Sequence, residues 1–341
     1  MKTRILKTTG DDRAGSIRTA VKLLAEGEVV AFPTETVYGL GADAFNRKAI
    51  RAIYKVKGRP SDNPLIVHIG SLSQVHPLAA TIPIRFWVLA EAFMPGPLTV
   101  VLRRSPALPR YLNPGLPSVA VRFPRHPVAR ALINEAGFPL VAPSANLSGR
   151  PSPTRAVHVL EDLDGTIHAI LDGGRCRVGL ESTVIDLTGR RPTVLRPGVI
   201  TVEQLEKVLR TKVGLARQTA KKPRSPGLKY RHYSPRAELI LLEGKKPEIR
   251  KALKEMSGAL KGKKKIGVLA LAGYTRPSER LDFFSLGTTG VEGAARKLFE
   301  GLRELDRRKV DVILCPAFEE EKVGTAVMNR LRKAATRRIR V

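Results

Sequence analysis

Pro60-Ser-Asp-Asn-Pro-Leu-Ile-Val-His68 is the most informative stretch of this sequence, and three cations, Lys55, Lys57 and Arg59, come just before it. Two prolines brace a turn that runs directly into a short apolar strand, and the strand ends in a histidine. Loops beside buried strands are where open α/β sheets bind ligands, and a loop of this charge density is suited to phosphate groups. The alternative is a solvated basic helix end followed by an ordinary turn, and the stretch alone does not choose between them.

Around this stretch, residues 1–210 alternate short β-branched runs with helical patterns, which predicts an α/β domain built on an open twisted sheet. An amphipathic helix is expected to begin at a Ser16 cap and to end at Gly27. The strands that we expect are 28–32, 65–69, 98–102, 119–123, 140–142, 167–171 and 183–187.

A second, smaller domain is expected at residues 237–341, where strands and helices alternate again. The strands expected there are 239–242, 266–271 and 310–315, and the helices are 248–260, 291–305 and a basic last helix, 325–338. The βαβ order predicts a parallel, Rossmann-like sheet.

Between the two domains, residues 211–236 are rich in Lys, Arg, Pro and Gly, which predicts an extended linker. A passive spacer has no need of Tyr230, His232 and Tyr233. We therefore expect residues 225–235 to act as a lid over the first domain, with Tyr233 reaching a bound nucleotide and Tyr230 as the alternative.

The charge of the chain points to anionic partners. Lys and Arg number 60 against 31 Asp and Glu, a net charge of +29, so nucleotides, RNA or both are expected. No apolar run reaches the roughly 18 residues of a membrane span, and the N-terminus lacks the apolar segment of a signal peptide. The two cysteines, Cys176 and Cys315, form no CxxC pair, which argues against a disulfide scaffold or a cysteine zinc site. We expect a cytoplasmic protein.

Common catalytic signatures are missing from the sequence. Gly39-Leu-Gly41-Ala-Asp-Ala44 has the spacing of a dinucleotide fingerprint, but six residues separate it from the preceding strand. We expect its glycines to form a tight turn instead. There is no Walker A sequence and no G-x-S-x-G elbow. Clustered carboxylates for a metal cage are also missing, so any Mg²⁺ would be carried by ATP phosphates and water.

Arg122 lies within the expected strand 119–123, where period-two alternation puts it on the same face as the small residue Ala120. That arrangement suits a bidentate clamp on a small carboxylate. An exposed arginine on a half-open sheet is the competing interpretation.

A loop with several hydroxyl groups and free amides, Pro143-Ser-Ala-Asn-Leu-Ser-Gly-Arg-Pro-Ser152, follows the expected strand 140–142. Glu181-Ser-Thr183 adds a similar hydroxyl turn, and Leu195-Arg-Pro-Gly198 adds another cation. Each could be an ordinary turn. Their number in one domain favours a site that holds phosphate or ribose.

Together these residues resemble the threonylcarbamoyl-AMP synthase family, the YrdC-like proteins, in its two-domain form. The matching segments span the first domain in order: Phe32-Pro-Thr-Glu-Thr-Val-Tyr-Gly-Leu-Gly41, Lys57-Gly-Arg-Pro-Ser-Asp-Asn-Pro-Leu-Ile-Val-His68, Pro95-Gly-Pro-Leu-Thr99, Ser118-Val-Ala-Val-Arg122, Ala142-Pro-Ser-Ala-Asn146, Gly179-Leu-Glu-Ser-Thr183 and Leu195-Arg-Pro-Gly198. The linker segment Pro226-Gly-Leu-Lys-Tyr-Arg-His-Tyr-Ser-Pro235 also resembles that of two-domain members, whereas the second domain matches in length and pattern only.

The resemblance implies that L-threonine, bicarbonate and ATP, with its Mg²⁺, give threonylcarbamoyl-AMP and pyrophosphate. The product would serve the modification of a tRNA adenosine beside the anticodon, through a downstream threonylcarbamoyl transferase complex. Contact with tRNA or double-stranded RNA is a further expectation.

Residue roles also follow from the resemblance. The residues implied to hold threonine are Thr36, His68, Arg122, Ala142 (through its backbone) and Ser182. Those implied to hold ATP are Arg59, Asn63, Ser118, Ser144, Ser152 and Arg196, to which the lid adds Tyr233. Lys57 and Arg59 are the expected catalytic residues and, with Lys55, bring positive charge to the phosphates.

Two other functions remain open on the sequence. The chain could be an RNA-binding subunit with a vestigial synthase site, although no RRM, KH or zinc signature appears. It could instead transfer carbamoyl groups from carbamoyl phosphate, although the zinc-finger-like cysteines and the acylphosphatase-type segment of the larger proteins with YrdC-like modules are missing.

Overall fold

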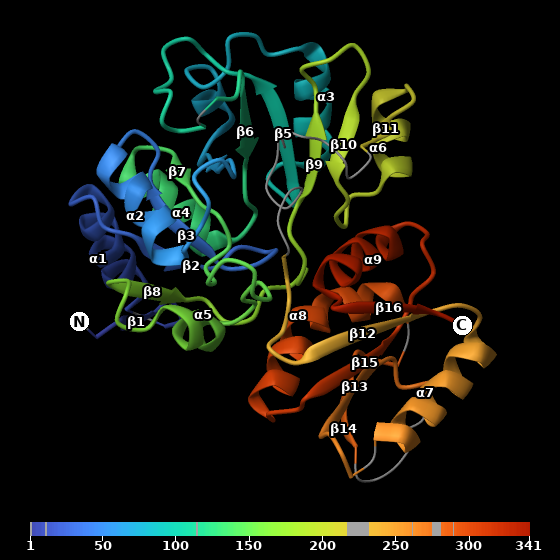
Figure 1. Ribbon diagram of the computed structural model, residues 1–341. Helices are drawn as coiled ribbons and strands as arrows, with labels where there is room; N and C mark the ends of the chain where they lie inside the picture. The colour runs from blue at the N-terminus through green and yellow to red at the C-terminus, as the bar shows by residue number, and fades with distance from the viewer. Residues whose placement is uncertain are drawn as a thin grey trace. The chain divides into compact units, whose positions relative to one another are not determined.

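The computed structural model describes residues 2–10, 12–113, 115–216, 232–260, 262–274, 281–288 and 290–341. The chain forms two compact units. Unit 1 comprises Met1–Ser148 and Ser152–Tyr230, and unit 2 comprises Gly149–Pro151 and Arg231–Val341 (Figure 1). Most of the expected linker, residues 217–231, lies outside the described residues, so the domain boundaries expected at 210 and 236 stay predictions.

Unit 1 is a mixed α/β unit with a large sheet. Its elements in chain order are β1 (Arg4–Lys7), α1 (Arg13–Ala25), β2 (Val30–Phe32), β3 (Gly39–Asp43), α2 (Arg47–Lys57), β4 (Ile66–His68), a 3-10 turn (Leu72–Val75), α3 (Ile84–Phe93), β5 (Leu98–Arg103), β6 (Ser118–Arg122), α4 (Pro127–Ala136), β7 (Leu140–Val141), α5 (Ala156–Leu163), β8 (Ala169–Asp172), β9 (Thr183–Asp186), β10 (Thr193–Arg196), α6 (Val202–Leu209) and β11 (Gly214–Leu215). The described strands form one sheet of eleven in the order β1-β8-β2-β3-β7-β4-β6-β5-β9-β10-β11. All seven strands expected from the sequence are present, whereas β1, β3, β10 and β11 were not expected.

Period-two alternation divides the buried side chains of unit 1 between two layers. In β2, Val30 and Phe32 pack with α1 and α4, whereas Ala31 joins the cluster that contains residues of α2, α3 and α5. Strands that are apolar on both faces, such as β2, are typical of a sheet covered by helices on both sides.

The segment Gly39–Asp43 corrects one expectation from the sequence. It is the strand β3, paired antiparallel with β2 and β7, and not a tight turn. A Cβ atom on Gly41 would lie 2.8 Å from a ring carbon of Phe32, and one on Gly39 would lie 3.2 Å from Cβ of Ala142. The two glycines therefore let the Phe32 ring and the end of β7 approach the β3 backbone.

Unit 2 is a smaller α/β unit with a parallel sheet. It contains β12 (Glu238–Glu243), α7 (Lys246–Leu260), β13 (Ile266–Ala270), β14 (Asp282–Ser285), α8 (Val291–Arg307), β15 (Val312–Pro316), α9 (Val323–Ala334) and β16 (Arg337–Arg340). Its five described strands follow the order β14-β13-β15-β12-β16, and every pair is parallel. Residues of α7 pack with Ile240 and Leu242 on one face of this sheet, and α8 and α9 lie on the other (Figure 1). The parallel α/β sheet expected from the sequence for this domain is therefore confirmed.

The end of the chain corrects a second expectation. The predicted basic helix 325–338 stops at Ala334, and Arg337–Arg340 forms β16 beside β12. Arg338 donates from Nε to Oε2 of Glu243 over 2.9 Å, so this residue of the expected basic helix instead pairs with an acidic residue of the neighbouring strand. None of the described helices is long and apolar enough to span a membrane.

Candidate active site

One face of the unit 1 sheet is covered by α1 and α4 over only part of its width. The covered part includes Phe32 and Leu140. Farther along the same face lies a small buried cluster that contains strand residues only: Ile66, Val101, Ala120 and Val184, with the half-buried Leu195 against it. This cluster forms the apolar floor of the candidate site, beside the polar residues His68, Arg122 and Arg196 of the same strands.

Strand register aligns two of the three arginines predicted to bind substrates. His68 in β4 is paired with Arg122 in β6, and Arg122 is paired with Thr99 in β5. Thr99 is in turn paired with Val184 in β9, and Val184 with Arg196 in β10. Because paired residues of adjacent strands point to the same face, His68, Arg122 and Arg196 form one row. Ser118 lies at the opposite end of β6 from Arg122.

Arg122 is held by a carboxylate that the sequence did not point to. Its side chain is 4% exposed, and its NH2 group donates to Oε1 of Glu35, itself 6% exposed, over 2.8 Å. Oε2 of Glu35 accepts from the backbone N–H of Arg125 over 3.1 Å. The Nε atom of Arg122 is buried without a hydrogen-bond partner among the described residues, so a donor remains for a ligand. Glu35 lies within the motif Phe32–Gly41, and this position was the only sequence signal for it.

The turn that carries Glu35 is tightly hydrogen-bonded. The hydroxyl groups of Thr34 and Thr36 lie 2.8 Å apart, and the Thr34 hydroxyl also donates to the carbonyl of Val37. The Thr34 hydroxyl lies 3.5 Å from NH2 of Arg122. The structure therefore brings Thr36 to the Arg122 end of the row, as a shared threonine-binding role requires.

His68 is neutral in this setting. Burial and the nearby Arg122 cation lower the pKa of His68 to about 3. Its Nδ1 atom lies 3.2 Å from the carbonyl of Ile66, which can only accept a hydrogen bond. Nδ1 thus carries the proton, and Nε2 is left as an acceptor. The backbone N–H of Ala142 donates to the same Ile66 carbonyl over 3.0 Å, so this N–H group is used in the hydrogen bonding between β7 and β4.

Ser182 joins the residues predicted for the two substrates. Its hydroxyl lies 2.7 Å from that of Thr99 and accepts from NH2 of Arg196 over 3.1 Å. Arg196 also donates from Nε to the Ser182 carbonyl over 3.1 Å. A residue predicted to bind threonine and one predicted to bind ATP are therefore in direct contact, as a reaction between the two substrates requires.

The loop after β7 is fixed by Lys57. This side chain is 2% exposed, and its ammonium donates to the carbonyls of Ser144 and Asn146. The backbone carbonyl of Lys57 accepts from the N–H of Ser148 over 2.8 Å. Lys55, in contrast, is exposed. The two lysines that the sequence placed together therefore have different surroundings.

Arg59 and Asn63 lie in the segment that joins α2 to β4. Arg59 is half-buried and donates to the carbonyls of Asn63 and Pro64 at 3.2 and 2.9 Å. The Nδ2 atom of Asn63 is buried and has no partner among the described residues, which leaves a second donor for a ligand. Farther along the chain, the buried Ser152 donates its hydroxyl to Oε1 of Glu181.

Tyr233 belongs to unit 2, where its ring stacks on Phe299 with a centroid distance of 5.3 Å. The guanidinium of Arg330 lies 5.8 Å from the Tyr233 ring centroid. The contact with a nucleotide stays a prediction, and most of the proposed lid, residues 225–231, lies outside the described residues.

Neither nucleophilic nor metal chemistry has a prepared site in the described part of the chain. Cys176 is buried, and burial raises the pKa of its thiol, which keeps it protonated. No group of three or more His, Cys, Asp or Glu residues among those described could hold a metal ion. The arrangement instead offers buried cations and hydroxyl groups, which can bind two anions side by side.

Comparisons with known proteins agree with this chemistry. A family model described as telomere recombination matches residues 22–198, and one described as threonylcarbamoyl-AMP synthase, C-terminal domain, matches residues 200–336. The chain is 49% identical to the threonylcarbamoyl-AMP synthase of Pyrococcus abyssi (strain GE5 / Orsay) over 95% of each chain. It is 47% identical to that of Bacillus subtilis (strain 168), over 95% of this chain and 94% of the relative.

A solved structure extends the likeness to three dimensions. The crystal structure of P. abyssi Sua5 complexed with L-threonine matches with a TM-score of 0.94 at 47% identity, over 99% of this chain and 100% of that chain. The motifs, the fold and these relatives agree, and the chain belongs to the threonylcarbamoyl-AMP synthase family.

Proposed function

We infer that this chain is a threonylcarbamoyl-AMP synthase and, by reaction class, a nucleotidyltransferase: it converts L-threonine, bicarbonate and ATP to threonylcarbamoyl-AMP and pyrophosphate. One observation carries the inference. Arg122 and Arg196 are both buried on one row of the sheet, and Thr99 lies on that row between them. The hydroxyl group of Ser182 contacts that of Thr99 and accepts from Arg196. Two buried guanidinium groups on one face suit two anionic substrates that must react with each other.

Threonine is proposed to occupy the Arg122 end of this row. Its carboxylate would accept from the free Nε of Arg122, while Glu35 keeps the guanidinium in place. Thr36, Ser182, the Nε2 atom of His68 and the backbone of Ala142 would bind its remaining polar groups. Glu35 also balances the Arg122 charge before substrate arrives, since an uncompensated buried cation is costly.

ATP is proposed to bind along the loops next to Arg196. Asn63, Ser118, Ser144 and Ser152 would bind the nucleotide through neutral donors, and Arg59 would face its phosphates. Lys57 would act by fixing the loop that carries Ser144, since its ammonium donates to the carbonyls of Ser144 and Asn146.

The reaction needs positioning more than it needs a base. Threonine and bicarbonate form an N-carboxylate with loss of water and one proton. A carbamate oxygen then attacks the α-phosphorus of ATP, one P–O bond forms, and the bond to the leaving pyrophosphate breaks. The nucleophile is already an anion, so proximity and electrostatic stabilisation account for the catalysis.

Mg²⁺ is proposed to arrive with ATP, bound by phosphate oxygens and water, because the described residues contain no carboxylate cluster that would hold it alone. When bound, it neutralises charge on the leaving pyrophosphate. Delivery of the product to a tRNA-modifying transferase complex, direct contact with tRNA or double-stranded RNA, and a cytoplasmic location stay predictions. The net charge of +29 supports the contact with RNA.

The decisive experiment is pyrophosphate release from ATP by the full chain, with threonine and bicarbonate each omitted in turn. The proposal expects release that needs both. Release without threonine would indicate an unrelated ATPase, and activity only when carbamoyl phosphate replaces bicarbonate would indicate a carbamoyl transferase. RNA binding without any release would indicate a vestigial site.

A further inference from the structure

The carboxyl ends of the central strands of unit 2 surround a cavity that the proposed function does not use. Its volume is about 610 Å³, which is within the range of pockets that hold small molecules. The walls come from the ends of three parallel strands: residues 244–246 after β12, Leu271 and Tyr274 after β13, and residues 316–319 at the end of β15. All of these residues belong to unit 2.

The topology of this sheet favours a ligand site at that edge. β12 and β15 are adjacent and parallel, but the helices that follow them lie on opposite faces: α7 packs on one face, and α9 lies on the other (Figure 1). The two chain segments therefore diverge beyond the strand ends. Open α/β sheets bind their ligands in the crevice that such a divergence leaves.

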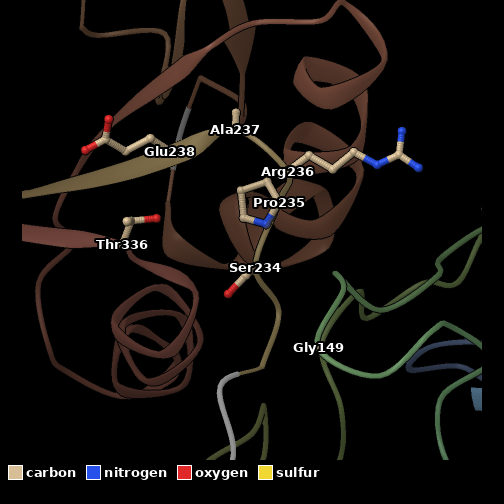
Figure 2. A pocket seen from close by; sticks show the side chains of 7 residues that line it. All are labelled: Gly149, Ser234, Pro235, Arg236, Ala237, Glu238 and Thr336. Carbon is tan, nitrogen blue, oxygen red and sulfur yellow. The ribbon is translucent and has the colours of Figure 1, made fainter. Parts of the chain in front are cut away.

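Another cavity of unit 2 lies at the opposite edge of the sheet. Its volume is about 440 Å³, and Figure 2 shows it beside Glu238, the first residue of β12, and Thr336, which precedes β16. These are the amino ends of parallel strands, whereas open α/β sheets bind ligands at the carboxyl ends. The cavity at the carboxyl ends is therefore the stronger candidate for a site.

The wall of this cavity is largely apolar and includes two aromatic rings. Tyr274 and Phe318 are both half-buried and line the cavity, together with Ile249, Leu271 and Val291. Burial raises the pKa of Tyr274, so its hydroxyl group is partly withdrawn from water. Rings and aliphatic side chains suit a flat ring system, because contact between flat apolar surfaces buries a large area.

Positive charge comes from the start of α7. Among the described lining residues, the charged side chains are Lys245, Lys246 and Glu319. Nζ of Lys246 lies 3.3 Å from Oε1 of Glu319, but the two side chains are 72% and 75% exposed, so this ion pair is weak in water and a ligand anion can replace it. Glu248 accepts from the backbone N–H of Lys245 over 2.9 Å, so its carboxylate caps the helix.

Arg250 adds a further cation beside the aromatic wall. Its guanidinium lies 5.8 Å from the centre of the Tyr274 ring and donates to the carbonyl of Gly273 over 3.1 Å. An anionic group is therefore favoured next to the flat apolar wall. A ring system and an anionic group occur together in a nucleotide.

We propose that unit 2 binds a nucleoside monophosphate at the carboxyl ends of β12, β13 and β15. The base lies against Tyr274 and Phe318, and the phosphate lies near Lys245 and Lys246. Every residue named for this site belongs to unit 2, so the site is independent of the proposed function.

The test puts a fluorescent reporter into the cavity of the full chain. Trp87 is the single tryptophan of the sequence and lies in unit 1, so Trp87→Phe/Phe318→Trp has one tryptophan, and it lines the cavity. AMP should quench its fluorescence saturably. Inorganic phosphate and adenosine should each bind roughly ten-fold more weakly, since each lacks one of the two recognised groups. No response to AMP, or phosphate that binds as tightly as AMP, would overturn the proposal.

Charge variants separate a specific site from the general attraction of a basic protein for anions. Lys245→Met/Lys246→Met should raise the Kd for AMP roughly ten-fold, the scale of one lost hydrogen bond to a charged group. Lys251→Met/Lys254→Met is the matched control, because it removes two exposed lysines of α7 that are not among the lining residues. The control should change the Kd less than two-fold, and equal effects of the two pairs would contradict the site.

Two further variants test where AMP binds. Ala317→Phe fills the cavity and should abolish the response; should it not fold, Leu271→Phe fills the cavity from another strand end. Arg196→Met removes a residue proposed to hold ATP in unit 1, and calorimetric titration of AMP into this variant, which keeps Phe318, should still detect one site. A response that survives a folded cavity-filling variant, or no binding to Arg196→Met, would place AMP outside the cavity and overturn the proposal.

Discussion

Replacement of Arg122 separates its two roles, which are to bind threonine and to neutralise a buried carboxylate. In Arg122→Met the threonine carboxylate loses a charged hydrogen-bond donor, which is worth about 1.5–3 kcal/mol. The Kd for threonine should therefore rise roughly 10- to 150-fold. The same substitution leaves Glu35 buried without its ion-pair partner, while the backbone N–H of Arg125 still donates to Oε2.

That second effect should appear as lost stability. Breaking a buried ion pair by removal of one partner costs about 3–5 kcal/mol, because the remaining charge is uncompensated. The double variant Arg122→Met/Glu35→Gln removes both charges, and it should recover most of the free energy of unfolding. It should not recover threonine affinity, since the Nε donor is still missing.

Calorimetric titration of threonine and urea unfolding measure the two effects on the same samples. Arg130→Ala is a suitable control, since it removes an exposed arginine of α4 that lies over Phe123. A threonine Kd within two-fold of wild type in the folded double variant would refute the assignment of Arg122 to the threonine carboxylate.

Substitutions of three other residues, His68, Lys57 and Tyr233, test the site and the end of the linker. Because the folded pKa of His68 is about 3 and the unfolded value is 6.5, the neutral ring contributes stability that is fully present above pH 6.5 and is lost as the pH falls toward 3. Between pH 7.5 and 5, this group lowers the free energy of unfolding of the wild type by about 2 kcal/mol, and His68→Asn should remove that pH dependence. An equal loss of unfolding free energy in the variant would contradict the assignment. Lys57→Ala should lower kcat/KM for ATP at least ten-fold in a pyrophosphate-release assay, because the loop that carries Ser144 is no longer held. Lys55→Ala removes an exposed lysine and should change kcat/KM less than two-fold. Equal losses in the two variants would indicate a simple effect of charge. Tyr233→Ala should lower the midpoint of thermal unfolding because it removes the ring stacked on Phe299. Tyr233→Phe keeps this stack and removes only the hydroxyl group, so a loss of activity in Tyr233→Phe would assign a role to the hydroxyl group.

The sequence by itself determined the parts of this protein that depend on neighbours along the chain. Short β-branched runs such as 65–69 and 98–102 predicted strands that the structure contains, because a short continuous apolar run is visible directly in the residue order and is typical of a buried strand. The βαβ alternation after residue 237 predicted a parallel sheet, since parallel strands need a helix-length crossover between them. The motif loops identified the family for the same reason: each is a local run of residues.

Contacts between distant segments were decided only by the tertiary structure. Gly39–Asp43 is a strand because β2 and β7 supply its backbone partners, and its glycines leave space for the Phe32 ring. Arg337–Arg340 is a strand because β12 supplies both the backbone partners and Glu243. Local propensity contains neither fact, since strand pairing depends on residues far away in the chain.

In the candidate site, too, the sequence identified individual residues, whereas only the tertiary structure showed their partners. The sequence proposed Arg122 as a lone cation beside Ala120, but the partner that holds it, Glu35, is 87 residues away. The hydroxyl group of Ser152 likewise donates to Glu181, 29 residues away. A residue's chemical type is visible in the sequence, whereas its charge balance and orientation depend on which distant groups the fold brings within hydrogen-bond distance.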